Sequence, residues 1–262
     1  MMPVLLRELA GSWRSTALWA LAIVAILTLY LPLYPSLTGG DMQQLLDSLP
    51  PDLVTTLGYD DITSGAGYAQ ATYFGLMGFF LITAASVTWA SQAIAGHEQS
   101  GRLELDLAHG VGRAQYVAAQ SLALIIRVLI LVAVGAVTVL AFNDSAELGL
   151  DPGPVLVASA ALAGLALFCG VWSLLAGAAI GGRALSAGIG ALVAVAGYAL
   201  NAVSRQNPDT EWLGDASPYT WAFGDDPLKG GVTIADQWQL WIFVLVFPLT
   251  AMLALRERDL RG

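Results

Sequence analysis

The sequence predicts an all-α polytopic membrane protein in which residues 1–262 form a single transmembrane domain. Of the 262 residues, 56% are hydrophobic and only 12% are charged, which is about half the charged share of a soluble domain. Six apolar stretches are also long enough to cross the hydrocarbon core as helices, which takes about 20 residues. None shows the alternation of a barrel strand, so helices are expected. The predicted spans are residues 17–35, 71–95, 117–142, 155–180, 184–203 and 238–255.

The segment before the first span is predicted to form a separate helix in the membrane interface. Within residues 3–15, the apolar residues Val4, Leu5 and Leu9 alternate at near-helical spacing with Arg7 and Glu8. This is the pattern of an amphipathic interfacial helix. The alternative is that these residues simply extend the first span.

Two connecting segments are too long to be turns. Residues 36–70 contain leucines at helical spacing, and Pro50 and Pro51 interrupt them, so two short helical pieces are expected there. Residues 204–237 combine acidic residues and prolines with aromatic rings that we expect at the membrane surface, where their amphipathic character is favoured. These rings are Trp212, Tyr219, Trp221 and Phe223.

The distribution of charge predicts the orientation, because cytoplasmic loops of membrane proteins hold an excess of Lys and Arg. Eight of the eleven basic residues fall on the side that carries both termini, and fourteen of the twenty acidic residues fall on the opposite side. Both termini are therefore expected in the cytoplasm, segments 36–70 and 204–237 outside, and the chain in the cell (inner or plasma) membrane. The net charge of −9 then belongs to the external loops, and no nucleic-acid partner is expected.

The connection between the second and third spans, residues 97–109, has the composition of a docking surface. Leu103, Leu105 and Leu107 alternate there with ionised residues, so a short helix would present leucines and carboxylates together on the cytoplasmic side. Such a surface suits the groove of a partner protein. The alternative is an ordinary amphipathic connector.

This connection resembles the coupling loop of the type-2 ABC exporter permeases, which are transmembrane subunits of ABC transporters. In that family the loop runs as an acid, a glycine, Leu-Glu, an apolar pair and a basic residue that opens the next helix. The Leu-Pro-Pro-Asp-Leu stretch of the first external loop also looks like that family, and the resemblance extends over nearly the full length. His97, Gln99 and His109-Gly110 depart from the pattern. The matching positions of the loop are Glu98, Gly101, Leu103, Glu104, Leu105, Ala108 and Arg113.

The resemblance implies an exporter in which two permeases, a second copy of this chain or a related one, bind two separate ABC ATPase subunits. ATP and Mg²⁺ would bind to those partners, and this chain would carry no cofactor. It also implies that Glu98 to Ala108 form the coupling helix, with Gly101 allowing a sharp turn and Leu103 and Leu105 filling a groove of the ATPase. A phosphate-binding loop needs a lysine after glycine, and the only lysine, Lys229, lies in a predicted external loop. No ATPase activity is therefore expected on this chain.

Several residues of the spans are candidates for a substrate pathway. Arg127 lies inside the third span, where a charge costs about 3 kcal/mol on insertion scales. It serves either in gating or substrate attraction, or merely snorkels or pairs with a polar neighbour. In the resembled family the second and fifth spans line the pathway at the dimer interface, and their mixture of hydroxyl and aromatic groups suits an amphipathic or hydrophobic cargo, drug-like (as in multidrug efflux) or lipid-like. The candidates on these spans are Thr72, Phe79, Phe80, Thr83, Tyr198 and Asn201.

The sequence leaves two other classes of function open. One is a membrane immunity or sensor subunit that transports nothing. The other is a membrane-embedded hydrolase, because His97-Glu98 begins like the zinc motif His-Glu-x-x-His; position 101 is glycine, however, and the chain has only two histidines. No metal site and no catalytic residue are therefore predicted.

Overall fold

The computed structural model describes residues 2–37 and 63–258, and these form helices joined by short turns, without a β-strand. Six helices are long and apolar enough to cross a membrane, which confirms the predicted all-α polytopic fold. The longer elements are α1 (Met2–Tyr30), α6 (Gly78–Ser91), α8 (Arg102–Ala108), α9 (Arg113–Phe142), α10 (Pro152–Ala179), α11 (Arg183–Ser204) and α14 (Trp238–Glu257). The shorter ones are η1 (Leu31–Leu33), α2 (Tyr34–Leu37), α5 (Gly65–Ala69), η2 (Gln70–Met77), η3 (Gln92–Gly96), α7 (His97–Gln99), η4 (Pro208–Thr210), α12 (Trp212–Asp215), α13 (Pro218–Phe223), η5 (Pro227–Lys229) and η6 (Ile234–Gln237).

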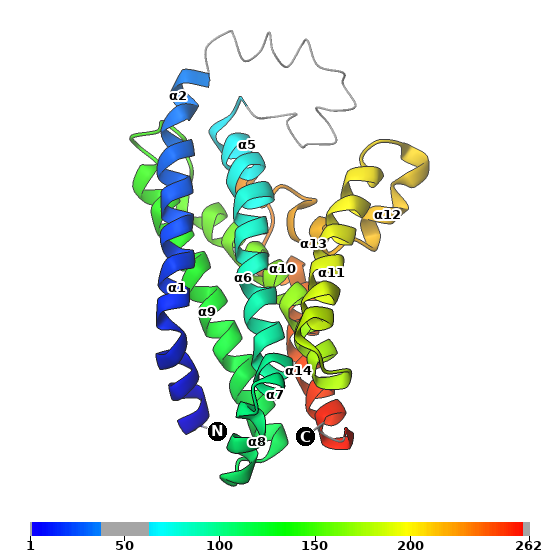
Figure 1. Cartoon of the computed structure of the whole chain (residues 1–262). Helices are drawn as coiled ribbons and strands as arrows, with labels where there is room; N and C mark the ends of the chain where they lie inside the picture. The colour runs from blue at the N-terminus through cyan, green and yellow to red at the C-terminus, as the bar shows by residue number, and fades with distance from the viewer. Residues whose placement is uncertain (1, 38–62, 259–262) are drawn as a thin grey trace.

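The long helices lie side by side in one bundle (Figure 1). The start of α1, the end of α14 and helices α7 and α8 lie together at one end of this bundle, which we call the α8 end. Helices α2, α5 and α12 lie at the opposite end, the α12 end. The first helix thus begins, and the last helix ends, on the same side as the predicted coupling segment. An even number of spans requires this arrangement.

Helix α10 occupies the centre of the bundle and packs against α6, α9, α11 and α14. Of its most apolar stretch, 78% is buried within this chain, whereas the corresponding figures for α1 and α11 are 17% and 22%. In a membrane protein, a helix that is apolar on all sides can be covered either by protein or by lipid. The peripheral helices therefore offer faces to lipid or to another protein.

Small residues allow α10 to approach its neighbours closely, as is common between membrane helices. A Cβ atom added at Gly170 would lie 2.2 Å from the Ser86 Oγ of α6. One turn further along α10, a Cβ atom at Gly190 of α11 would lie 2.9 Å from the Ser173 Cβ. Glycine at these two positions therefore sets the separation of α10 from α6 and α11.

The first helix differs from the prediction. Residues 3–15 are not a separate interfacial helix, because α1 continues without a break from Met2 to Tyr30. Val4 and Leu5 are buried in a helix that packs along α9, and the hydroxyl of Ser12 donates to the Glu8 carbonyl at 2.7 Å. The alternative, an extension of the first span, describes the structure.

The second span is longer and less regular than predicted. It runs from Gly65 to Gln99, and two π-helical segments, η2 and η3, interrupt it. Such segments are rare and often occur at functional sites. Hydrophobic periodicity does not distinguish them from regular α-helix over so few residues.

The segment 204–237 is also more structured than predicted, since it holds η4, α12, α13, η5 and η6. Trp212 is exposed there, as expected of a ring at the membrane surface, but Phe223 is buried and Tyr219 and Trp221 are half-buried. These three rings pack inward on the helices. The two helical pieces predicted between residues 36 and 70 lie largely outside the described residues.

Candidate functional site

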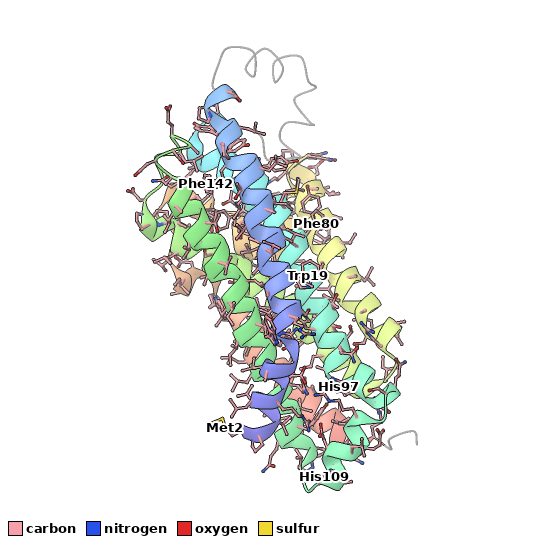
Figure 2. All side chains as sticks on the ribbon, turned by 60° about the vertical axis from the view of Figure 1, so that its left-hand side comes forward. Met2, Trp19, Phe80, His97, His109 and Phe142 are labelled. Atoms are coloured by element: carbon pink, nitrogen blue, oxygen red, sulfur yellow. The ribbon has the colours of Figure 1, made fainter. Side chains whose placement is uncertain are left out.

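The predicted coupling segment forms two short helices, α7 and α8, which lie at the α8 end of the bundle (Figure 1). Gly101 joins them with a φ of 70°, in the left-handed region that glycine adopts without steric cost. The sharp turn predicted at this glycine is thus present. In Figure 2, His97 and His109 mark the two ends of the segment.

Ion pairs hold α8 against the first turns of α1. The Arg7 guanidinium pairs with the Asp106 carboxylate, and Arg102 Nη2 lies 3.6 Å from Glu8 Oε2. The Asp106 carboxylate is buried, so its pairing with Arg7 also removes the cost of an isolated charge. A displacement of α8 would therefore be transmitted to α1.

A second set of contacts joins the segment to the ends of α10 and α14. Glu98 pairs with Arg258, which also donates from Nη1 to the carbonyls of Gly177 and Ala178 at 2.9 and 3.1 Å. Arg113 Nη1 lies 2.8 Å from the Leu255 and Arg258 carbonyls. Both arginines thus sit at the C-terminal ends of helices, where the last carbonyls and the negative end of the helix dipole favour a cation.

The predicted coupling residues divide between the outside and the inside of the chain. Leu105 is 61% exposed and Ala108 is also exposed, so both face outward at the α8 end. Leu103 is fully buried, because α8 turns this face onto the bundle. The expectation that Leu103 fills a groove of a partner is therefore wrong for this conformation, in which it packs inside the protein.

Two acidic residues of the segment have different surroundings. Glu98 is half-buried in its pair with Arg258. Both carboxylate oxygens of Glu104 are covered, and within the described part of the chain neither has a hydrogen-bond partner. A covered carboxylate without partners is costly, so Glu104 is the member of the segment whose charge the described residues leave uncompensated.

His97 has a structural environment. Its ring is buried, and Nδ1 lies 2.7 Å from the Tyr116 hydroxyl, which donates to the Ala93 carbonyl at 3.2 Å. Among residues 2–37 and 63–258, no three His, Cys, Asp or Glu side chains gather as metal ligands. The start of a zinc motif at His97-Glu98 thus has no partner residues in the described chain.

The predicted pathway residues converge between α6, α11 and α13. The Tyr198 ring centroid lies 6.3 Å from that of Phe79 and 6.1 Å from that of Phe80, and Tyr219 lies 5.3 Å from Phe79. Thr83 is buried on the following turn of α6, and its hydroxyl has no partner among the described residues. We call Phe79, Phe80, Tyr198 and Tyr219 the aromatic cluster.

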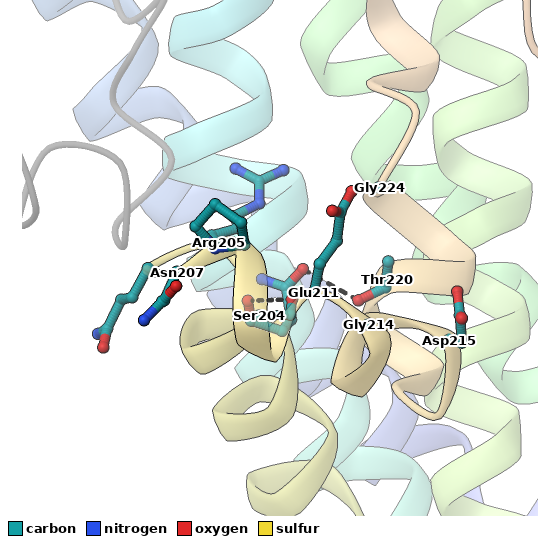
Figure 3. A pocket seen from close by; sticks show the side chains of 11 residues that line it. Ser204, Arg205, Asn207, Glu211, Gly214, Asp215, Thr220 and Gly224 are labelled. Carbon is teal, nitrogen blue, oxygen red and sulfur yellow. Dashed lines mark hydrogen bonds between the residues drawn. The ribbon is translucent and has the colours of Figure 1, made fainter.

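Two pathway candidates lie away from this cluster. The Thr72 hydroxyl donates to the Tyr68 carbonyl of its own span at 2.6 Å, so it is occupied locally. Asn201 is buried at the α12 end of α11, where its Oδ1 accepts from the Thr220 hydroxyl at 3.1 Å. It lines a pocket of about 460 Å³ at the α12 end, together with Arg205, Glu211 and Asp215 among others (Figure 3).

Arg127 is buried at 6% exposure rather than extended to the membrane surface. Its guanidinium carbon lies 3.8 Å from the centroid of the Trp89 ring, and Nε donates to the Thr16 hydroxyl at 3.3 Å. Of the alternatives predicted for Arg127, the structure thus shows the contact with a polar neighbour. No carboxylate of the described chain lies within ion-pair distance of it.

Several residues of these sites could not be found from the sequence. Tyr219 joins the aromatic cluster from a segment predicted to lie on the surface, and its hydroxyl donates to the Gly75 carbonyl of η2 at 2.8 Å. Burial raises the pKa of this hydroxyl. The roles of Trp89, which covers Arg127, and of Arg258, which pairs with Glu98, cannot be predicted from their local sequence. Each contacts a residue that is distant in the sequence.

Comparison with known proteins assigns the family. No curated protein matches the chain. A sequence model of a family, described as "ABC-2 family transporter protein", matches residues 2–204. This match spans five of the six long helices and includes α7 and α8, so the chain belongs to the ABC-2 transporter family and is a multi-pass membrane subunit of the permease type.

Proposed function

We propose that this permease is the membrane subunit of an ATP-driven exporter and that two separate ABC ATPase subunits bind to it at the α8 end. The observation that carries the proposal is the outward face of α8, with Leu105 and Ala108 exposed beyond the bundle. An exposed leucine on a short helix outside the membrane suits the groove of a partner. Lys229, the only lysine of the chain, pairs with Asp226 at the other end, which supports placing ATP and Mg²⁺ on the partner subunits.

The contacts of α8 support a coupling role. Pairs of Arg7 with Asp106 and of Arg102 with Glu8 tie it to α1, and the pair of Glu98 with Arg258 ties α7 to α14 and α10. Movement of the ATPase subunits would thus reach helices on both sides of the bundle. Coupled movement of this kind is what alternating access requires.

The aromatic cluster supports a pathway for an amphipathic or hydrophobic substrate, drug-like or lipid-like, along α6 and α11. Phe80 is 48% exposed on α6, and Leu192 is 66% exposed on α11. Exposed faces on two adjacent helices, which pack together, suit a second permease, either another copy of this chain or a related one. In the proposed dimer the cluster would border the space between the two permeases.

The proposed membrane is the cell membrane, with the α8 end and both termini in the cytoplasm. Arg102, Arg113 and Arg183 are the first residues of their helices at that end, and Arg7 and Arg14 lie in the first half of α1. Such an excess of arginine is typical of the cytoplasmic side. This orientation places α8 where ATP is available.

The test is to replace Leu105 with arginine and to purify the tagged chain from its own host. The wild-type sample is expected to contain an ABC ATPase subunit and to hydrolyse ATP. Leu105→Arg puts a charge into the proposed groove and is expected to reduce the bound ATPase and the ATP turnover about tenfold or more, the effect of losing a central apolar contact of roughly 2 kcal/mol.

Trp212→Arg is the matched control, because it changes an equally exposed apolar residue at the α12 end. Its ATPase content should equal that of wild type. Equal association of wild type and Leu105→Arg, with equal turnover, would contradict the proposed docking at α8.

A further inference from the structure

A polar pocket of about 300 Å³ lies in the half of the bundle nearer the α8 end. Its walls come from α1, α6 and α9, with α8 and the start of α11 at its border. Figure 2 shows α1 between α9 and α6 at this level. Three arginines line the pocket, namely Arg102, Arg127 and Arg183.

The described residues do not balance the charge inside this pocket. Glu8 is the only carboxylate in the lining, and it lies 3.6 Å from Arg102. Arg127 and Arg183 have no carboxylate within ion-pair distance among the described residues. The lining therefore holds three positive charges and one negative charge. Of the three arginines only Arg127 is buried, where an isolated charge is unfavourable.

Arg127 is the arginine of this pocket that most needs an anionic partner. A charged residue deep in a span costs about 3 kcal/mol on insertion scales, and stacking on Trp89 returns about 0.5–2 kcal/mol of this. Its Nε is bonded to Thr16, and neither Nη atom has a protein hydrogen-bond partner within the described chain. A planar guanidinium with two free donors is suited to bind two oxygens of a phosphate or carboxylate.

We infer that the pocket binds the phosphate-bearing headgroup of an anionic phospholipid from the leaflet at the α8 end. A lipid fits better than a soluble anion, because helices that line the pocket also carry exposed apolar residues close to it. Leu18, on α1 one turn beyond Ser15 of the lining, and Leu185, two residues after Arg183, are both exposed. Acyl chains could lie along these faces while the phosphate contacts the arginines. The inference does not depend on transport or on an ATPase.

Binding of lipid to the purified full chain tests this site. Native mass spectrometry in detergent would measure the apparent Kd for phosphatidylglycerol and for phosphatidylcholine with the same acyl chains. Wild type is expected to bind phosphatidylglycerol about tenfold or more tightly, because the trimethylammonium group of phosphatidylcholine would place a positive charge beside the arginines, and tenfold corresponds to about 1.4 kcal/mol. Arg127→Gln should remove most of this preference, and Arg127→Lys should restore part of it.

Two further variants at exposed positions separate an effect on lipid binding from an effect on folding. Arg183 is exposed at the start of α11, so Arg183→Gln should fold normally and weaken phosphatidylglycerol binding about two- to fivefold, the range for an exposed ionic contact. Arg14→Gln removes the same charge from an exposed position of α1 outside the pocket and should change nothing.

Three results would overturn the inference. They are equal affinity of wild type for the two lipids, equal loss of preference in Arg14→Gln and Arg183→Gln, and displacement of phosphatidylglycerol by inorganic phosphate at equal concentration. The last would show that the pocket selects free phosphate rather than a lipid. None of these results bears on whether an ATPase binds at Leu105.

Discussion

At the scale of single residues, the two partners of the ion pair between Arg7 and Asp106 differ in solvent exposure. The Arg7 side chain is 50% exposed, whereas that of Asp106 is 8% exposed. Removing the carboxylate leaves an arginine that water can solvate, but removing the arginine leaves a covered carboxylate. The free-energy cost of losing one partner is larger when the remaining partner is the buried one.

Arg7→Ala should therefore destabilise the protein more than Asp106→Ala. We expect a loss of about 2–3 kcal/mol for Arg7→Ala, from an unpaired buried charge, and about 1 kcal/mol for Asp106→Ala, from a half-exposed pair. The double variant should be more stable than Arg7→Ala alone, because the stranded carboxylate is gone. Thermal unfolding in detergent measures the order, and hydrogen exchange of α8 amides shows whether the loss is local. The opposite order would mean that Asp106 is solvated in the native state.

At the scale of helices, the separation of α6 and α10 depends on the absence of a side chain at Gly170. The Ser86 Oγ occupies the space that a Cβ atom there would need, and this hydroxyl has no partner among the described residues. Packing, not hydrogen bonding, therefore sets this contact. A membrane helix pair of this kind tolerates little added volume.

Gly170→Ala should cost about 1–3 kcal/mol through overpacking. Ser86→Ala removes the clashing oxygen and should restore most of that loss in the double variant. Gly153→Ala is the control in the same helix, because a Cβ atom there meets nothing within 4 Å; it should be neutral or stabilising by about 0.5–1 kcal/mol. Thermal unfolding of the four variants provides the comparison. Equal losses for Gly153→Ala and Gly170→Ala would show that backbone entropy, and not the contact with Ser86, governs these glycines.

At the scale of the whole molecule, the sequence predicts what depends on local composition. Apolar runs of sufficient length predict the six spans, and Gly101 predicts the turn before α8. Contacts between distant residues are not visible in this way: Glu98 and Arg258 are 160 positions apart, and Tyr219 reaches Phe79 from a segment whose polar composition suggested the surface. The same reason explains the error at Leu103, because leucine is equally suited to a groove in a partner and to the interior.

The orientation of the whole molecule can be tested with cysteines at its two ends. The natural Cys169 is buried, so it should give no background with a membrane-impermeant maleimide. Ser145 and Ser100 are both exposed; Ser145 lies in the short connection between α9 and α10, and Ser100 lies between α7 and α8. Because arginines concentrate at the α8 end, that end should face the cytoplasm.

Ser145→Cys should therefore react in intact cells, whereas Ser100→Cys should react only after the membrane is made permeable. Equal reaction of both variants in permeable cells controls for accessibility of the two thiols. The reverse pattern in intact cells would place α8 outside, away from ATP, and would exclude coupling of α8 to a cytoplasmic ATPase. The lipid pocket beside Arg127 would then belong to the outer leaflet, so this one measurement fixes the side of the membrane for both sites.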